Sequence, residues 1–152
     1  ISVSTWIYPR SYYWTGNSGD PNSTIVRRFQ YTYSNPQGGT WGINFNATSI
    51  SAFILNVSGT TQSVVYSTPI PLNSWSNIIF TYNGSVLNLF LNGNLVASKS
   101  TNIILNVSGN SGISIGESNQ ANGYWNYTNG KIDDIGIWNR ALTQEEITNL
   151  NN

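Results

Sequence analysis

The stretch GKIDDIGIWNRALTQEEITNL, residues 130–150, decides the fold. Its first part, up to Trp138, predicts a β-strand, and successive side chains of a strand point to opposite sides. On this pattern both faces of the strand are partly apolar. One face carries Asp133, Ile135 and Ile137, and the other carries Ile132, Asp134 and Trp138.

The second part of the stretch predicts a short helix. Thr143 is a suitable N-cap, and Glu146 follows three residues later, which is the spacing of a capping box. Leu142 precedes the cap and is positioned to contact Ile147 as a hydrophobic staple. We therefore expect the chain to leave a sheet after Trp138 and to dock a short helix on it.

Working outward, residues 75–98 predict three antiparallel strands. Asn83-Gly84 and Asn92-Gly93 separate the apolar runs 75–82, 85–91 and 94–98. Asn-Gly favours hairpins because both central residues of a type I′ turn need positive φ. On the middle run, Leu87, Leu89 and Leu91 share one face, whereas Val86, Asn88 and Phe90 share the other.

Five further runs have the composition of strands: 1–8, 24–33, 40–46, 50–56 and 61–66. In the third, Trp41, Ile43 and Phe45 share one face. The segments 11–23 and 117–129 are predicted loops, since they are rich in Gly, Asn and Ser. About ten strands at spacings near ten residues indicate an all-β sandwich. Aromatic residues in strands are usually buried, which predicts core positions for Trp6, Trp41, Trp75 and Trp138.

Four stretches together resemble the laminin G-like jelly-roll domains of the concanavalin A-like lectin/glucanase superfamily: ISVSTWIYP at 1–9, the run from Ser74 to Ser98, ISIG at 113–116 and GKIDDIGIWNRALTQEEI from Gly130. The resemblance implies a jelly-roll β-sandwich of two antiparallel sheets with a short C-terminal helix, as one domain over residues 1–152 of a larger surface protein. Family members usually carry an additional N-terminal strand region, which leads us to expect a preceding segment.

Charged residues form 8% of the chain, with six basic residues against six acidic ones. This composition excludes the basic patch that nucleic acid or anionic lipid requires. No apolar run approaches the length of a membrane helix, and no signal peptide is visible, so any export signal or anchor would lie outside this segment. The uncharged polar surface fits an extracellular or cell-surface location. The absence of Cys does not decide the compartment.

Asn-x-Ser/Thr motifs offer candidate glycosylation sites. Because Asn, Ser and Thr are so frequent here, roughly five such motifs arise by chance alone. The motifs are therefore consistent both with chance and with glycosylation. The motifs begin at Asn22, Asn46, Asn56, Asn83, Asn106 and Asn126.

The acidic residues do not form a recognisable catalytic pair. Glycoside hydrolysis needs two carboxylates flanking one bond. Asp133 and Asp134 are adjacent on a predicted strand and should point apart, and Glu146 is explained by capping. The hydrolase branch of the resembled superfamily carries a Glu-x-Asp-x-x-Glu strand that this chain lacks. With no His or Cys, nucleophilic triads are also excluded. We expect no enzymatic activity.

The resemblance implies one metal ion. Members of the superfamily often bind a structural calcium at the position of Asp133, and calcium accepts carboxylates and carbonyls in flexible geometry. Alternatively, Asp133 accepts hydrogen bonds from backbone N–H groups or pairs with Arg140.

Two predicted loops combine aromatic rings with amide and hydroxyl groups, the mixture that binds sugars. The candidate ligand-binding residues are Tyr12, Tyr13 and Trp14 in the first loop and Tyr124, Trp125 and Tyr127 in the second. These rings would instead be structural if they cap the open end of the sandwich.

Together with the resemblance, these residues indicate non-catalytic recognition of glycans or surface proteins, or adhesion, at a cell or particle surface. The competing hypothesis is an architectural module of a filament, sheath or adhesin, in which the same aromatics are buried against other copies or domains.

Overall fold

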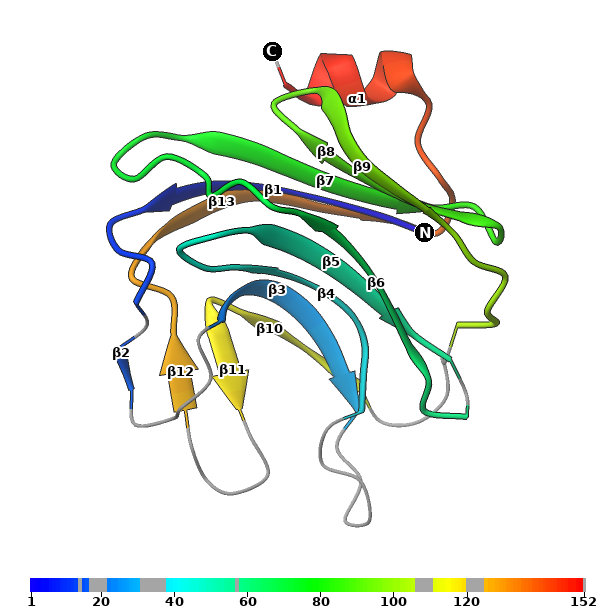
Figure 1. Ribbon diagram of the computed structural model, residues 1–152, viewed down its shortest axis with the longest axis horizontal. Coiled ribbons are helices and arrows are strands. Elements are labelled where there is room, and N and C mark those ends of the chain that lie inside the picture. The colour runs from blue at the N-terminus through cyan, green and yellow to red at the C-terminus, as the bar shows by residue number, and fades with distance from the viewer. Residues whose placement is uncertain are drawn as a thin grey trace.

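The computed structural model describes residues 1–13, 15–16, 22–30, 38–56, 58–105, 111–119 and 125–151. Two five-stranded antiparallel sheets face each other, and one short helix lies on the outer side of the first sheet (Figure 1). This is the expected jelly-roll β-sandwich.

The first sheet has the strand order β13-β1-β7-β8-β9. The predicted hairpins join its last three strands. Asn92 and Gly93 have φ values of 49° and 77°, as a type I′ turn requires. The other turn is held differently, because Asn83 Oδ1 accepts the backbone N–H groups of Ser85 and Val86. The strands are Ser2–Pro9 (β1), Ser76–Tyr82 (β7), Val86–Leu91 (β8), Asn94–Ser100 (β9) and Gly130–Trp138 (β13).

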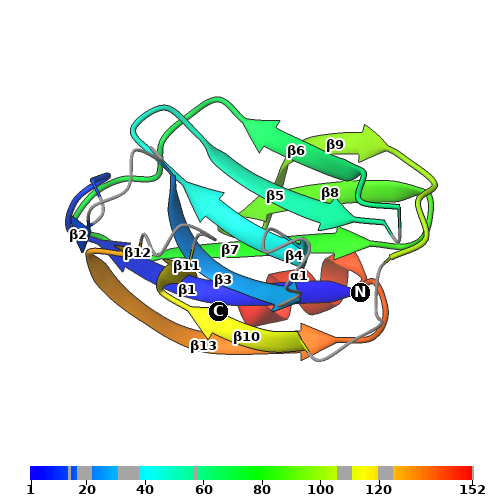
Figure 2. The same ribbon diagram turned by 90° about the horizontal axis from the view of Figure 1, so that it is seen from below.

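The second sheet has the order β10-β3-β4-β5-β6. On one long side of the sandwich, β6 packs against β9 of the first sheet. On the other long side, the edge strands β10 and β13 run along the border of the two sheets (Figure 2). The strands are Ser23–Gln30 (β3), Gly38–Phe45 (β4), Ile50–Leu55 (β5), Thr61–Tyr66 (β6) and Ser111–Ile115 (β10).

A third, small sheet has the order β11-β12-β2. Its strands are Thr15–Gly16 (β2), Glu117–Asn119 (β11) and Trp125–Tyr127 (β12). The prediction of loops over 11–23 and 117–129 is therefore wrong for these short strands. They are too brief for an alternating pattern to distinguish them from turns.

The core lies between the two large sheets. Trp41, Ile43 and Phe45 of β4 are buried, as their alternation predicts, and so are Leu87 and Leu89 of β8. The rings of Trp41 and Phe80 meet across the two sheets with centroids 6.1 Å apart. Full burial of an aliphatic or aromatic side chain contributes about 1.5–3 kcal/mol, so this interlocked layer holds the sheets together.

The helix α1, Gln144–Leu150, begins as the sequence predicts. Thr143 Oγ1 accepts the N–H of Glu146 at 3.3 Å, and a Glu146 carboxylate oxygen accepts the N–H of Thr143 at 2.9 Å. Leu142 and Ile147 pack together against Ile79 and Phe90 on the outer face of the first sheet. No helix in the described part of the chain has the length and apolarity to cross a membrane.

A β-bulge interrupts β13 opposite Thr5. Ser4 faces Gly136, but Trp6 faces Asp133, so β13 has one more residue than β1 over this interval. Asp134 has a φ of 47°, in the left-handed region. The predicted division of faces is therefore wrong, because Ile132 and Ile135 both pack against the core.

The prediction that four strand tryptophans are buried holds only in part. Trp41 is buried, and Trp138 packs beside α1. In contrast, Trp6 is half-buried and Trp75 is 42% exposed. Trp6 lies on the outer face of β1, and Trp75 precedes β7. Strand periodicity alone cannot tell an outer face that a helix covers from one that stays open.

Ser2 connects β1 to the segment that leads into α1. It is fully buried, its Oγ donates to Arg140 O at 2.9 Å, and the same oxygen accepts the N–H of Leu142 at 2.9 Å. We predict that Ser2→Ala lowers the free energy of unfolding by about 1–3 kcal/mol, because a buried N–H group loses its acceptor. Urea unfolding measures this. Ser85→Ala, at an exposed turn, is the control and should cost little; equal losses would contradict the prediction.

Glu146 also predicts a pH dependence of stability. Its hydrogen bonds with Arg140, and secondly with the Thr143 backbone, lower the pKa of this carboxyl to about 2 from 4.5. Because the pKa is lower in the folded protein, the stabilisation is present above pH 4.5 and is lost as the pH falls towards 2. We expect Glu146→Gln to reduce the fall of Tm over this range. Glu145→Gln should leave that fall as in the parent protein, and the same effect from both variants would refute the assignment.

Candidate functional site

The two aromatic segments singled out in the sequence meet at one end of the sandwich. Strand β2 pairs with β12 so that Thr15 faces Tyr127, and β12 pairs with β11 so that Tyr127 also faces Glu117. We call residues 12–13, 15–16, 117–119 and 125–127 the aromatic rim. The backbone thus brings together segments that lie more than a hundred residues apart in the sequence.

An aromatic ring and a carboxylate lie side by side on the rim. Residues directly opposite in an antiparallel pair point to the same face, so Tyr127 and Glu117 share one. Tyr127 is 46% exposed, and Glu117 is half-buried. An open tyrosine ring next to a hydrogen-bond acceptor can contact the apolar face of a sugar and one of its hydroxyl groups.

The tyrosines of the first segment differ in their surroundings. Tyr13 is 76% exposed. Tyr12 packs against the core, and its hydroxyl donates to Ile70 O at 2.8 Å. Tyr12 therefore fixes the start of the rim, whereas Tyr13 is open to a ligand.

The rim is attached firmly to the second sheet. Gly116, with a φ of 68°, turns the chain from β10 into β11, and its N–H donates to Ile25 O at 2.8 Å. Thr128 follows β12; its N–H donates to Gly116 O and its Oγ1 donates to Thr24 O at 2.6 Å. Residues held by such bonds lose little further freedom when a ligand binds.

Part of the predicted rim lies outside the described residues. This holds for Trp14 and Tyr124, and for the side chain of Trp125, whose backbone belongs to β12. The exposure of Trp14 and Trp125, which would best separate a binding role from a structural one, therefore stays a prediction.

The family model described as the concanavalin A-like lectin/glucanases superfamily (Laminin G 3) matches residues 1–148. The chain belongs to this superfamily. A comparison with curated proteins gives no match.

Solved structures of lectin-like domains have the same fold. The chain aligns over 99% of its length with the CBM40 of the Ruminococcus gnavus IT-sialidase bound to α2,3-sialyllactose, with a TM-score of 0.78, 12% identity and 82% of that chain covered. The heptameric SAP-like pentraxin of Limulus polyphemus gives 0.70, 13% identity and coverage of 99% and 69%. The binding domain of botulinum neurotoxin serotype G gives 0.70 and 21% identity, over 99% of this chain but only 35% of that one.

These likenesses show the fold alone. The identities are too low to assign a ligand, and the toxin domain is far longer than this chain. The ligand of this chain depends on the side chains that it exposes.

Asp133, where the resemblance implies a calcium ion, lies opposite Trp6 on the outer face of the first sheet. There Asp133, Asp134, Trp6 and Trp75 line a hollow of about 240 Å³. Asp133 Oδ1 accepts the N–H of Asp134 at 2.9 Å, while Arg140 pairs with Glu146 instead. Calcium takes about six to eight oxygens, and the described residues bring no third carboxylate near. Calcium at Asp133 stays a prediction.

The expectation that Asp133 and Asp134 point apart is wrong, because the bulge lets both line one hollow. Both come from consecutive positions of β13, however. Superfamily hydrolases need carboxylates that flank the scissile bond, one acting on each side. Two acids side by side on one strand do not provide that arrangement.

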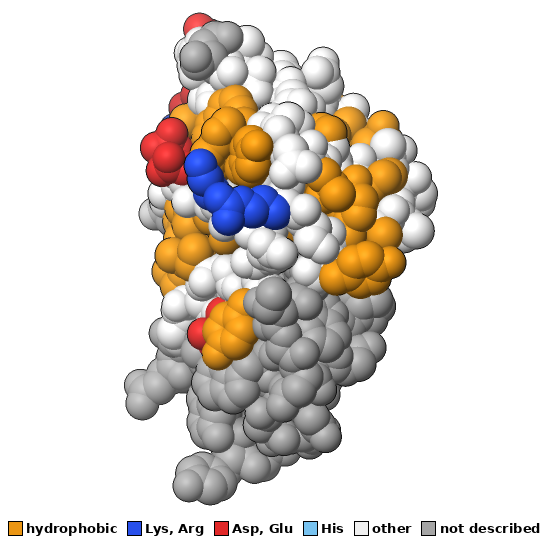
Figure 3. Space-filling view, turned by 90° about the vertical axis from the view of Figure 1, so that its left-hand side faces the viewer, with side chains coloured by type: hydrophobic (Ala, Val, Ile, Leu, Met, Phe, Trp, Pro, Cys, Tyr) orange, Lys and Arg blue, Asp and Glu red, His pale blue; other side chains and the backbone are white. Residues whose placement is uncertain are grey.

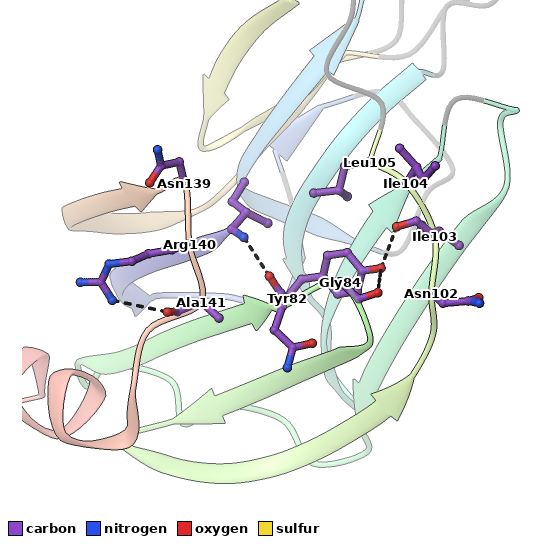
Figure 4. A pocket seen from close by; sticks show the side chains of 11 residues that line it. Tyr82, Gly84, Asn102, Ile103, Ile104, Leu105, Asn139, Arg140 and Ala141 are labelled. Atoms are coloured by element: carbon purple, nitrogen blue, oxygen red, sulfur yellow. Dashed lines mark hydrogen bonds between the residues drawn. The ribbon is translucent and has the colours of Figure 1, made fainter.

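A larger hollow, of about 650 Å³, lies near Ile1 (Figure 4). Two of its polar groups, the Tyr82 hydroxyl and the N-terminal amine, already have partners within the protein. Tyr82 hydroxyl donates to Ile103 O at 2.7 Å, and Ile1 N donates to Tyr82 O at 2.8 Å. Burial raises the pKa of the Tyr82 hydroxyl, although the bond to Ile103 opposes this. The hollow offers a ligand mainly apolar contact with Ile104 and Leu105.

Several of the candidate glycosylation motifs form turns. Asn46 Oδ1 accepts the N–H groups of Thr48 and Ser49, and Asn56 Oδ1 accepts those of Ser58 and Thr60. Such Asx turns give Asn46 and Asn56 a structural role that needs no glycan. Asn22 and Asn46 also bond to each other, Asn83 holds the turn described above, Asn106 lies outside the described residues, and so does the side chain of Asn126.

Proposed function

We propose that the domain is a non-catalytic lectin that binds glycans at a cell or particle surface, outside the cytoplasm, through the aromatic rim. The observation that carries the proposal is the pairing of β2 with β12. It joins the two aromatic segments and leaves Tyr13 and Tyr127 open at one end of the sandwich.

The chemistry of the rim supports a glycan over other ligands. Pyranose rings present C–H groups on one side, which contact aromatic faces, and hydroxyl groups on their edges. Tyr13 and Tyr127 offer exposed rings, and Glu117 offers an acceptor beside Tyr127. The CBM40 bound to α2,3-sialyllactose makes sialylated glycans one class to test.

The net charge of the chain also fits this class. Small sugars bind shallow sites by stacking and hydrogen bonding, with few ion pairs. The chain has a net charge of zero, so long-range attraction of strongly charged partners contributes little.

A second candidate is the architectural module, favoured by the open long side of the sandwich. There Ile113 and Ile115 of β10 and Ile137 of β13 are 52%, 55% and 43% exposed. Exposed isoleucines along two edge strands provide an apolar surface for another protein. This surface shares no residue with the rim, so the two functions can be tested apart.

The glycan function predicts specific binding that depends on the rim tyrosines. On an array of neutral and sialylated glycans, we expect protein produced without N-glycans to bind a defined subset. Tyr13→Ala and Tyr127→Ala should each weaken that binding about tenfold, or ~1.4 kcal/mol, since each removes an exposed ring. Isothermal titration with the best glycan gives the Kd.

Trp75→Ala is the matched control, because Trp75 is about as exposed as Tyr127 but lies on the outer face of the first sheet. It should leave glycan affinity unchanged. If no glycan binds at high protein concentration, or if all three variants lose affinity equally, the rim is not a glycan site. Self-association abolished by Ile113→Asp, in the same preparations, would then favour the architectural module.

A further inference from the structure

Helix α1 covers only part of the outer face of the first sheet. It packs on Ile79, Phe90 and Trp138. Towards the end of β1 the face is uncovered, and there Trp6, Trp75, Asp133 and Asp134 surround the hollow of about 240 Å³. Figure 3 views this end of the molecule and shows hydrophobic, basic and acidic side chains close together.

The hollow combines two indole rings with two carboxylates. Trp6 and Asp133 are direct cross-strand neighbours and so share the outer face. A regular strand would turn Asp134 to the other side. The bulge and the positive φ of Asp134 bring its carboxylate to the same hollow as that of Asp133. Bulges commonly re-aim side chains in this way.

Among the described residues, which include every Lys and Arg, neither Asp133 nor Asp134 forms an ion pair, and Arg140 pairs with Glu146. The closest candidate in sequence, Lys131, instead lies over the ring of Tyr8, with Nζ 5.5 Å from the centroid. Tyr8 contacts Trp75 edge to face at 5.6 Å. The neighbouring ring thus already attracts an ammonium group, while the hollow itself receives none.

The lining selects among ligand classes. Anions are repelled by two carboxylates. Calcium requires more oxygens than two aspartates supply, and indole rings offer none. A neutral apolar group would gain from the rings but not from the acids. An alkylammonium group gains from both, because its charge is attracted to the faces of Trp rings and to carboxylates, while its methyl or methylene groups contact the indoles.

We propose that this hollow is a second binding site, which takes an alkylammonium group carried by a ligand. It is independent of the aromatic rim in residues and in chemistry. The volume of about 240 Å³ admits one small cationic head group and leaves the rest of the ligand in solvent.

The test titrates the folded protein with tetramethylammonium chloride and, in parallel, with the neutral isostere 3,3-dimethyl-1-butanol. Tryptophan fluorescence and amide NMR shifts both report binding. We expect millimolar affinity for the cation, at least fivefold weaker affinity for the isostere, and weaker cation binding at higher salt. Perturbed amides should map to residues around Trp6, Trp75 and Asp133.

Substitutions then separate charge from aromatic contact. Asp134→Asn keeps a residue type that tolerates positive φ and removes only the charge, so it should weaken tetramethylammonium binding about fivefold without lowering Tm. Asp133→Asn should act similarly. Trp75→Ala should weaken binding of the cation about tenfold. Tyr127→Ala, at the rim, is the control and should have no effect, whatever it does to glycan binding.

The carrier of the ammonium group is identified by further probes. Comparing the affinity for glucosamine with that for N-acetylglucosamine tests whether an amino sugar carries the ammonium group. Nα-acetyl-lysine amide tests whether a lysine side chain carries it. Preferential binding of either cationic compound supports the site and identifies the carrier. Equal affinity for the cation and its isostere would overturn the proposal. So would binding that Asp133→Asn and Asp134→Asn leave intact, or a hollow that binds calcium but no ammonium compound.

Discussion

The strict alternation of side chains along β1 is the constraint on which the rest of this structure depends. β1 pairs with β13 on one side and with β7 on the other, so it is an interior strand of the first sheet. Its inward residues Val3 and Ile7 belong to the core. Its outward residues have separate tasks: Ser2 holds the segment before α1, and Trp6 lines the hollow. Shifting β1 by one residue would exchange the two sets and expose the core.

Much of the fold could be predicted because local signals and tertiary packing agree. The capping box at Thr143, the Asn92-Gly93 turn and the alternation of Trp41, Ile43 and Phe45 are short-range patterns with one physical solution each. The architecture of two sheets and a helix follows from their sum. The family model over residues 1–148 confirms the resemblance carried by residues 1–9, 74–98, 113–116 and 130–147.

The sequence could not reveal features that depend on contacts between distant segments. The small third sheet consists of strands of two or three residues, and only the pairing partner makes β2 a strand at all. The bulge in β13 depends on its register with β1, which no single strand encodes. For the same reason the exposure of Trp75 could not be predicted: it depends on how far a short helix extends over the sheet.

The candidate site was predictable in kind but not in detail. Aromatic residues in two polar segments pointed to the rim, and the structure brings these segments together. It also gives the two tyrosines of the first segment different roles. Tyr12 packs inward and its hydroxyl bonds to Ile70 O, whereas Tyr13 is exposed to solvent. The acidic hollow could not be predicted from the sequence, because strand alternation places its two aspartates on opposite faces. In a chain with so few charges, two adjacent acids that form no ion pair with a described residue stand out.

The bulge at Asp134 constrains how this domain can vary among related proteins. The extra residue is what allows Ile132 and Ile135, three positions apart, to contact the same core. Deleting it would force one isoleucine out into water, whereas exchanging its side chain would not. The side chain at position 134 can therefore change, but the number of residues between Ile132 and Ile135 cannot. A single substitution at this position would remove one acid of the hollow and leave the sandwich intact.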